Sequence, residues 1–247
     1  MIVAIDGLDG SGKETTCREL ANMLVERNIV HKDFVKVHSF PDYTIPSGKE
    51  IKRVLSGDLL AGTPKQAKAL MIATLFAYNR AEHFVRTNFK DDSANQQCVH
   101  IFDRYWASNI LYQGIGLSGE DLNTFAGYCK NMDMQLGNPM PDVYYFLHLP
   151  YSILSKHLQG RESKSGVTDT YEEDTFQMCV YHLSEYIISE GKNYPNLDIY
   201  DKVIECASKT KTVGTGITLD NWYQESVSCI VQNIYENLRD YAGAFSK

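Results

Sequence analysis

The chain has 247 residues, 43% of them hydrophobic and 22% charged, which is typical of a single folded domain and unlike a disordered or fibrous protein. Its formal net charge of −7 argues against DNA or RNA as the main partner, because a polyanion is attracted to a basic surface, and leaves small anionic ligands as candidates. Six cysteines without a CxxC pair favour reduced thiols in a cytoplasmic protein, and no run approaches the ~18 apolar residues of a membrane span.

Apolar, β-branched runs alternate with helical patterns along the chain. We predict strands at residues 1–6, 34–39, 98–103, 143–149 and 202–206, and helices at residues 13–27, 64–89, 171–189 and 221–241. This alternation predicts an α/β fold of three layers, in which a five-stranded parallel sheet has helices on both faces. Residues 1–247 are expected to form one domain, with ligands bound beyond the carboxyl ends of the strands.

The first predicted strand runs directly into Gly7-Leu8-Asp9-Gly10-Ser11-Gly12-Lys13, which opens the first predicted helix. Strand, glycine-rich loop and helix in this order indicate a P-loop, where backbone N–H groups and a lysine hold the phosphates of a nucleoside triphosphate such as ATP. We expect Lys13 to be a solvated cation in the empty protein. The candidate ATP-binding residues are Gly7, Gly10, Ser11, Gly12, Lys13, Glu14 and Thr15.

The P-loop departs from its usual pattern at one position. The residue after the lysine is usually a Ser or Thr that ligates Mg²⁺, and here it is Glu14, followed by Thr15. Either Thr15 substitutes as the ligand, or the metal is held mainly by phosphates, water and carboxylates.

A P-loop occurs in kinases, GTPases and motors and does not distinguish these classes, but three later motifs narrow the class of protein. These are Phe40-Pro41-Asp42-Tyr43 after the second strand, Phe76-Ala77-Tyr78-Asn79-Arg80 in the helix at 64–89, and Asp103-Arg104-Tyr105 with Ser108-Asn109 after the third strand. Together with the P-loop, they resemble the thymidylate kinase family over most of the first 150 residues. The resemblance implies a phosphotransferase that moves the γ-phosphate of ATP, with Mg²⁺, onto dTMP to give dTDP for dTTP synthesis. It also implies a homodimer.

The resemblance implies roles for residues near the acceptor phosphate and the metal. Arg104 would grip the 5′-phosphate of dTMP, as a bidentate guanidinium can, and Tyr43 would hydrogen-bond to it. Asp9 would face the acceptor sugar and phosphate. Asp103 would lie near Mg²⁺ or hold Arg104, although the dipeptide alone could equally be a salt bridge at a strand end.

Further residues would hold the nucleoside. Phe76 would stack on thymine and Arg80 would donate to its O4. Phe76 alone would more often be a core residue, but its spacing of four from Arg80 places both on one helix face and favours the stacking role. Asn109 would meet N3 of the base, and Tyr105 and Tyr112 would crowd C2′ of the sugar. The full set of candidate dTMP-binding residues is Asp9, Phe40, Tyr43, Phe76, Arg80, Arg104, Tyr105, Ser108, Asn109 and Tyr112.

The polar stretch at about residues 157–171 is expected to be a mobile lid loop. Some family members carry an arginine inside the P-loop where this chain has Gly10, so Arg161 in the lid is the expected source of the missing cation, with Lys156 and Lys164 as weaker supports. Glu172 would approach the metal or order the lid. The expected catalytic residues are Lys13, Asp9, Arg104 and Arg161, and the metal candidates are Asp103, Thr15 and Glu172.

Two alternatives stay open at this point. A broader deoxynucleotide or deoxynucleoside kinase shares the P-loop and the sheet, and a catalytically silent nucleotide-binding protein is compatible with Glu14 at the metal position. Extra segments at about residues 193–223 exceed the usual length of the family, and the sequence assigns them no function.

Overall fold

A computed structural model describes residues 1–56, 60, 62–89, 98–165, 174–206 and 227–236, and for residues 159–165 and 205 it describes the backbone alone. Its centre is one parallel sheet in the order β2-β3-β1-β4-β5. The strands are β1 (Ile2–Gly7), β2 (Val35–Ser39), β3 (Val99–Asp103), β4 (Val143–His148) and β5 (Lys202–Glu205). The predicted α/β fold with five parallel strands is therefore confirmed, with strand ends shifted by one residue at most.

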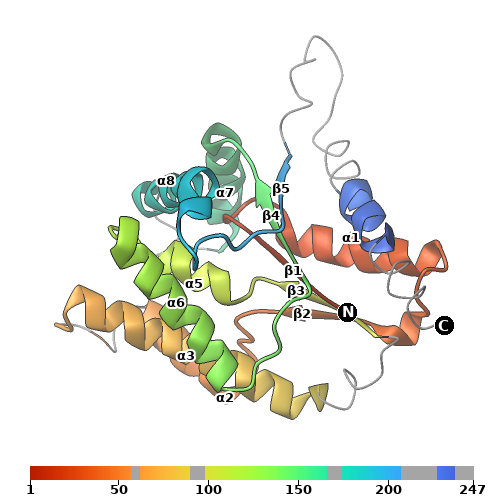
Figure 1. Cartoon of the computed structure of the whole chain (residues 1–247), viewed down its shortest axis with the longest axis horizontal. Coiled ribbons are helices and arrows are strands. Elements are labelled where there is room, and N and C mark those ends of the chain that lie inside the picture. The colour runs from red at the N-terminus through yellow and green to blue at the C-terminus, as the bar shows by residue number, and fades with distance from the viewer. Residues whose placement is uncertain (57–59, 61, 90–97, 166–173, 207–226, 237–247) are drawn as a thin grey trace, which may run out of the picture.

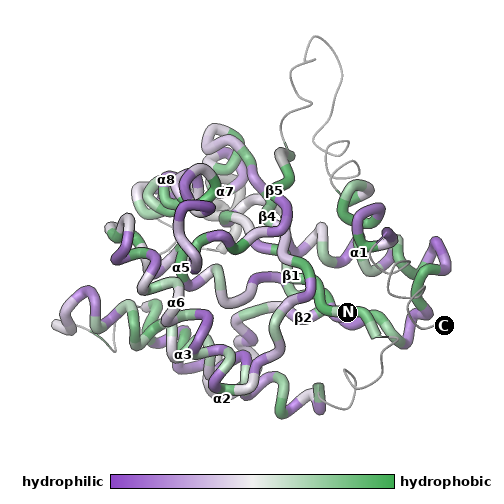
Figure 2. Tube along the Cα trace, in the orientation of Figure 1, coloured by the Kyte–Doolittle hydropathy of each residue, from purple (hydrophilic) through white to green (hydrophobic). Residues whose placement is uncertain are grey.

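Strand β1 lies in the middle of the sheet and pairs with β3 on one side and β4 on the other, with Val3 opposite both Ile101 and Val143. Its residues Val3, Ala4 and Ile5 are fully buried, because helices cover both faces of the sheet. Figure 1 shows α1 (Lys13–Glu26) on one side of the sheet and α3 (Lys65–Arg86), α5 (Trp106–Gln113) and α6 (Gly119–Gln135) on the other. Figure 2 shows the outer helices alternating between hydrophilic and hydrophobic residues, as amphipathic helices do.

Four helices in the described part of the chain were not predicted. Besides α5 and α6, these are α2 (Pro46–Leu55) and α7 (Tyr151–Ser165). Helix α7 also corrects the expected lid: residues 157–165 continue a helix that begins directly after β4, and residues 166–171 lie outside the described part of the chain.

The predicted helix at 171–189 is α8 (Asp174–Glu190), and part of the one at 221–241 is helical over residues 227–236. Short 3₁₀ turns occur at Lys32–Phe34 and Gly191–Asn193. Residues 193–201, the start of the unassigned extra segments, connect α8 to β5 and dock on α6, where Asn196 bonds to the side-chain oxygen of Asn123 (3.0 Å) and to its carbonyl (3.2 Å). Residues 207–223 lie outside the described chain.

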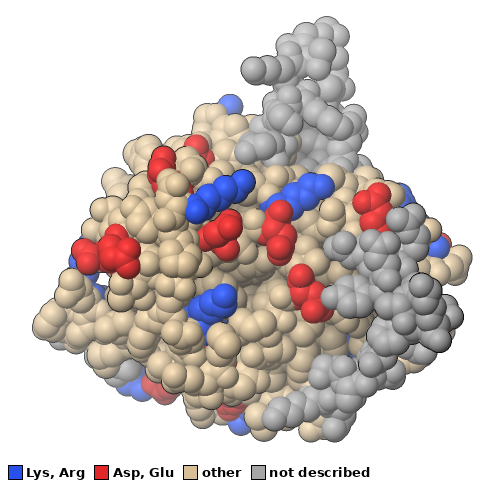
Figure 3. Space-filling view, viewed as in Figure 1, with Lys and Arg blue, Asp and Glu red and all other residues tan. Residues whose placement is uncertain are grey.

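Charged side chains on the face seen in Figure 3 are mixed: lysines and arginines alternate with aspartates and glutamates around a shallow hollow. No described helix is long and apolar enough to cross a membrane.

Candidate active site

The loop after β1 has the backbone that a phosphate cradle requires. Gly7, Gly10 and Gly12 have φ angles of 154°, 81° and 83°, a region that residues with a side chain rarely adopt. A Cβ at Gly7 would lie 2.6 Å from Oγ of Ser11 and 2.8 Å from the carbonyl of Leu147. The loop therefore needs glycine both for its turns and for close packing.

The position of Lys13 differs from the predicted one. Lys13 is not solvated in this structure: its side chain is 6% exposed and its Nζ donates to the carbonyl of Leu8 at 2.6 Å. Burial, followed by the nearby charge of Arg104, lowers the pKa of Lys13 to about 8, against the opposing effect of three aspartates. Glu14 is exposed and Thr15 is half-buried, so Glu14 points away from the cradle.

Asp9 is the centre of a polar cluster that ties the P-loop to two other helices and to the end of β3. It forms an ion pair with Arg104 and accepts hydrogen bonds from the hydroxyl of Tyr112 (2.9 Å) and from Nε2 of Gln177 (3.0 Å). Burial raises the pKa of Asp9, but the charges of Arg104 and Lys13 outweigh it and hold this pKa well below its usual range. Asp9 is therefore a carboxylate over the whole physiological pH range.

Arg104 has a strained backbone, with φ of 65°. The left-handed region costs a non-glycine residue roughly 1–2 kcal/mol, and such strain is often found at functional sites. Its N–H donates to the carbonyl of Ile5 at 3.0 Å, which fixes it against β1. Burial lowers the pKa of Arg104, but the paired Asp9 raises it further, so the guanidinium keeps its charge.

A second aspartate, Asp6, is fully buried, whereas Asp9 is half-buried. Asp6 accepts hydrogen bonds from the hydroxyls of Ser108 and of Tyr144, the latter at 2.7 Å, and burial raises its pKa against these bonds. The hydroxyl of Ser108, expected to bind dTMP, is therefore engaged in holding α5 to β1.

Two buried oxygens near the P-loop have no hydrogen-bond partner among the described residues: Oδ1 of Asp103 and Oγ of Ser11. Oxygen donors of this kind suit Mg²⁺, which takes few protein ligands and keeps phosphate and water oxygens. Asp103 holds its other oxygen 3.3 Å from the hydroxyl of Ser39. Within the described chain, no group of three His, Cys, Asp or Glu side chains could hold a metal alone.

The segment after β2 is fixed to α3 by a ladder of polar contacts. Asn79 is fully buried; its Oδ1 accepts from the N–H of Asp42 (2.8 Å) and its Nδ2 donates to the carbonyl of Asp42 (3.0 Å) and the hydroxyl of Ser47 (2.8 Å). Glu82 accepts the N–H of Ser47 at 3.0 Å, and His83 bonds to the Asp42 carboxylate at 2.7 Å. We call Asn79, Glu82 and His83 the α3 clamp.

Arg80 and Phe76 share one face of α3, as predicted, but Arg80 is only 2% exposed. Its Nε and Nη2 donate to the two oxygens of the buried Asp133 at 2.7 and 2.6 Å, and Asn138 donates to Asp133 at 2.8 Å. A base could therefore meet only Nη1 or the second N–H of Nη2. Phe76 is half-buried, and Asn109 is 2% exposed.

The other four candidate aromatic residues are placed differently from one another. Tyr105 is fully buried, with its hydroxyl on the carbonyl of Pro139 (2.6 Å), and Phe40 is packed against it in the core. This placement argues against the expected contact of Tyr105 with the sugar. Tyr112 joins the Asp9 cluster, and Tyr43 is 39% exposed beside the charge of Lys52.

The lid candidates are only partly placed. Arg161 and Lys164 lie in the helical backbone of α7, Lys156 is exposed on the same helix, and Glu172 lies outside the described residues.

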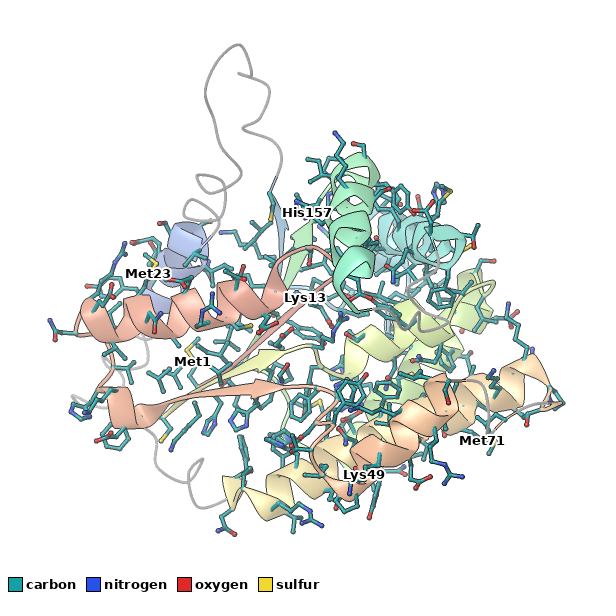
Figure 4. All side chains as sticks on the ribbon, turned by 180° about the vertical axis from the view of Figure 1, so that it is seen from behind. Met1, Lys13, Met23, Lys49, Met71 and His157 are labelled. Atoms are coloured by element: carbon teal, nitrogen blue, oxygen red, sulfur yellow. The ribbon has the colours of Figure 1, made fainter. Side chains whose placement is uncertain are left out.

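Three site residues were missed by the sequence: Gln177, Asp133 and His157. Each contacts a predicted site residue across 53 to 168 positions of sequence. Figure 4 shows α7, with His157, beside the start of α1 at Lys13. Neither periodicity nor a local motif indicates such contacts.

Known proteins resemble this chain over most of its length. The family model described as thymidylate kinase matches residues 5–209. A putative thymidylate kinase of Treponema pallidum is 26% identical over 97% of this chain and 95% of its own length. The thymidylate kinase of Schizosaccharomyces pombe is 30% identical over 80% of this chain and 83% of its own length.

A solved structure of a thymidylate kinase is also similar to this chain. The thymidylate kinase of Candida albicans superposes with a TM-score of 0.57 at 26% identity, covering 95% of this chain and 92% of that one.

Proposed function

The chain belongs to the thymidylate kinase family, and we propose that it transfers the γ-phosphate of ATP to dTMP, giving dTDP. The observation that supports this most is the Asp9–Arg104 ion pair. It joins the P-loop, which suits the donor phosphates, to the strained residue after β3, which suits the acceptor phosphate. Donor and acceptor sites that share an ion pair allow direct transfer between two bound phosphates.

Phosphoryl transfer needs positioning and positive charge more than covalent help. Lys13 would exchange the carbonyl of Leu8 for a phosphate oxygen, and Arg104 would hold the acceptor phosphate while Asp9 fixes its guanidinium. Asp103, Ser11 and Thr15 would hold Mg²⁺, which when bound with ATP neutralises charge on the transferring phosphates. Arg161 would add a cation near the γ-phosphate, and Glu172 would order the lid or approach the metal.

For the nucleoside, we propose that Phe76 stacks on thymine while Arg80 and Asn109 read its edge. The buried pair with Asp133 supports a fixed orientation of Arg80, because a bidentate carboxylate leaves the guanidinium little freedom. Cytosine presents an amine where thymine presents O4, so a donor would meet a donor, a mismatch of about 1–3 kcal/mol.

We also propose a cytoplasmic homodimer. On α3, Met71, Tyr78 and Val85 are spaced by seven residues and are 51%, 52% and 77% exposed, an apolar stripe that suits a second α3. Sedimentation should give a dimer for the unmodified protein and a monomer for Tyr78→Glu. A monomeric unmodified protein would contradict the homodimer.

The proposed reaction is tested by measuring ADP release with a panel of nucleosides and monophosphates. We expect dTMP to be preferred about 10- to 100-fold over dCMP, with dUMP weaker than dTMP and no activity on nucleosides. Similar rates with dCMP and dTMP would favour a broader deoxynucleotide kinase, and no ADP release with any acceptor would favour a silent nucleotide-binding protein.

A further inference from the structure

Helix α7 lies directly on the P-loop at Gly10. Nδ1 of His157 is 2.7 Å from the carbonyl oxygen of Gly10. A Cβ built on Gly10 would lie 3.1 Å from Cβ of His157 and 3.4 Å from the carbonyl of Leu154, and Gly10 has φ of 81°. Because a carbonyl only accepts, Nδ1 of His157 must carry the proton, so the neutral ring has its other nitrogen bare.

This bond acts on a peptide group that is held from both sides. In a trans peptide the carbonyl and the following N–H point in opposite directions. The carbonyl of Gly10 accepts from His157, and the N–H of Ser11 donates to the carbonyl of Leu8 at 3.1 Å. The same Leu8 carbonyl accepts from Nζ of Lys13 at 2.6 Å. His157 is therefore linked to the resting place of Lys13 through a single rigid peptide.

We propose that His157 is a positioning residue of the donor site. By holding the carbonyl of Gly10 it sets the plane of the peptide between Gly10 and Ser11, and so prepares the P-loop and Lys13 for the phosphates of a nucleotide. It also makes the position of α7 depend on the shape of the P-loop. The inference rests on the proposed function only in taking the P-loop as the nucleotide site, so its main test measures nucleotide binding, and turnover of dTMP enters only as a further readout.

The test measures the Kd of ADP with Mg²⁺ by calorimetry in the full chain. His157→Leu, which fills the space without a donor, should raise this Kd about tenfold. His157→Asn places an amide nitrogen near the position of Nδ1 and should stay within about twofold of the unmodified protein, whereas His157→Gln places its amide farther out and should resemble the leucine variant. Ser152→Ala, on the exposed side of α7, is the matched control and should change nothing.

Further readouts separate positioning from packing. In the unmodified protein, ¹⁵N spectra of the neutral ring should show the Nδ1-protonated tautomer of His157. In the Leu and Gln variants, the KM of ATP should rise while the KM of dTMP stays constant. If His157→Leu does not fold, the ADP affinities of the Asn and Gln variants are compared with each other instead.

An ADP affinity unchanged by His157→Leu, an Asn variant as weak as a folded Leu variant, or the Nε2-protonated tautomer would each overturn the proposal. Absence of ADP binding in the unmodified protein would instead overturn the assignment of the P-loop as the nucleotide site.

Discussion

Lys13 supplies a functional charge, but its buried position destabilises the folded chain when it is charged. Its pKa is about 8 in the folded chain and ~10.4 in an unfolded one, so between these values the unfolded chain binds more protons and stability rises with pH. Below pH 8 the folded chain bears the full free-energy cost of keeping the buried Lys13 protonated. We predict that Lys13→Met raises the free energy of unfolding by roughly 2–3 kcal/mol at pH 7, with a gain that shrinks towards pH 10, and abolishes transfer. Urea unfolding at pH 7 and pH 10 measures the stability, and ADP release measures the transfer. A variant that is less stable than the unmodified protein at pH 7, or one that is fully active, would contradict the prediction.

Arg104 and Arg161 should act at different stages. We predict that Arg104→Ala raises the KM of dTMP and lowers kcat, because its phosphate contact exists before transfer and its ion pair also orders Asp9. Arg161→Ala should lower kcat on the order of 10³-fold with the KM of dTMP little changed, as for other cations that meet the transferring group mainly in the transition state.

Steady-state kinetics separate the two arginines, with Lys130→Ala on the exposed side of α6 as the control. A full kcat in Arg161→Ala, or a change confined to KM, would shift the role to Lys156 or Lys164.

Among the elements, α3 has the clearest structural task, because the α3 clamp fixes the segment that carries Asp42 and Tyr43. We predict that Asn79→Ala lowers the free energy of unfolding by about 3 kcal/mol, since it leaves several buried polar groups without partners. Hydrogen exchange of the Asp42 amide should become faster. The exposed Gln66→Ala on the same helix should do neither, and unchanged exchange in Asn79→Ala would show that the clamp does not hold the segment.

Elements with a strong local pattern could be predicted from the sequence, and the others could not. The five strands are short β-branched runs between turn residues, so their positions were clear. Helix α5 is buried at seven of its eight residues and has no polar face, and α6 contains Gly119 and Gly127, so neither shows a clear amphipathic stripe. Helix α2 does bury Ile51, Val54 and Leu55 on one side, but it is short and contains Pro46 and Gly48, which are typical of turns. The P-loop could be predicted because it is contiguous, whereas Asp133 and Gln177 reach the site only through the fold.

At the scale of the molecule, a buried chain of imidazoles should govern acid stability. His38 lies 2.9 Å from His83 and 3.1 Å from His100, and His83 in turn bonds to Asp42. Burial, with the neighbouring His83, His100 and Lys36, lowers the pKa of His38 to about 3. Because an unfolded histidine binds its proton near pH 6.5, stability must fall as the pH drops from there towards 3.

We predict that His38 contributes about 2 kcal/mol to the loss of stability between pH 7 and pH 5. Urea unfolding at the two pH values should show a correspondingly smaller loss for His38→Gln. Parallel pH profiles of the two proteins would mean that His38 is protonated in the folded state.

The central place of β1 has a consequence for how the chain is made. The first strand pairs with β3 and β4 alone, so residues 2–7 have no sheet partner until residues 99–103 are available and gain the second only with residues 143–148. At a synthesis rate of ~5–20 residues per second, the glycine loop that follows β1 therefore waits on the order of ten seconds on the ribosome before its supporting strands exist. The segment that is translated first is among the last to reach its final shape.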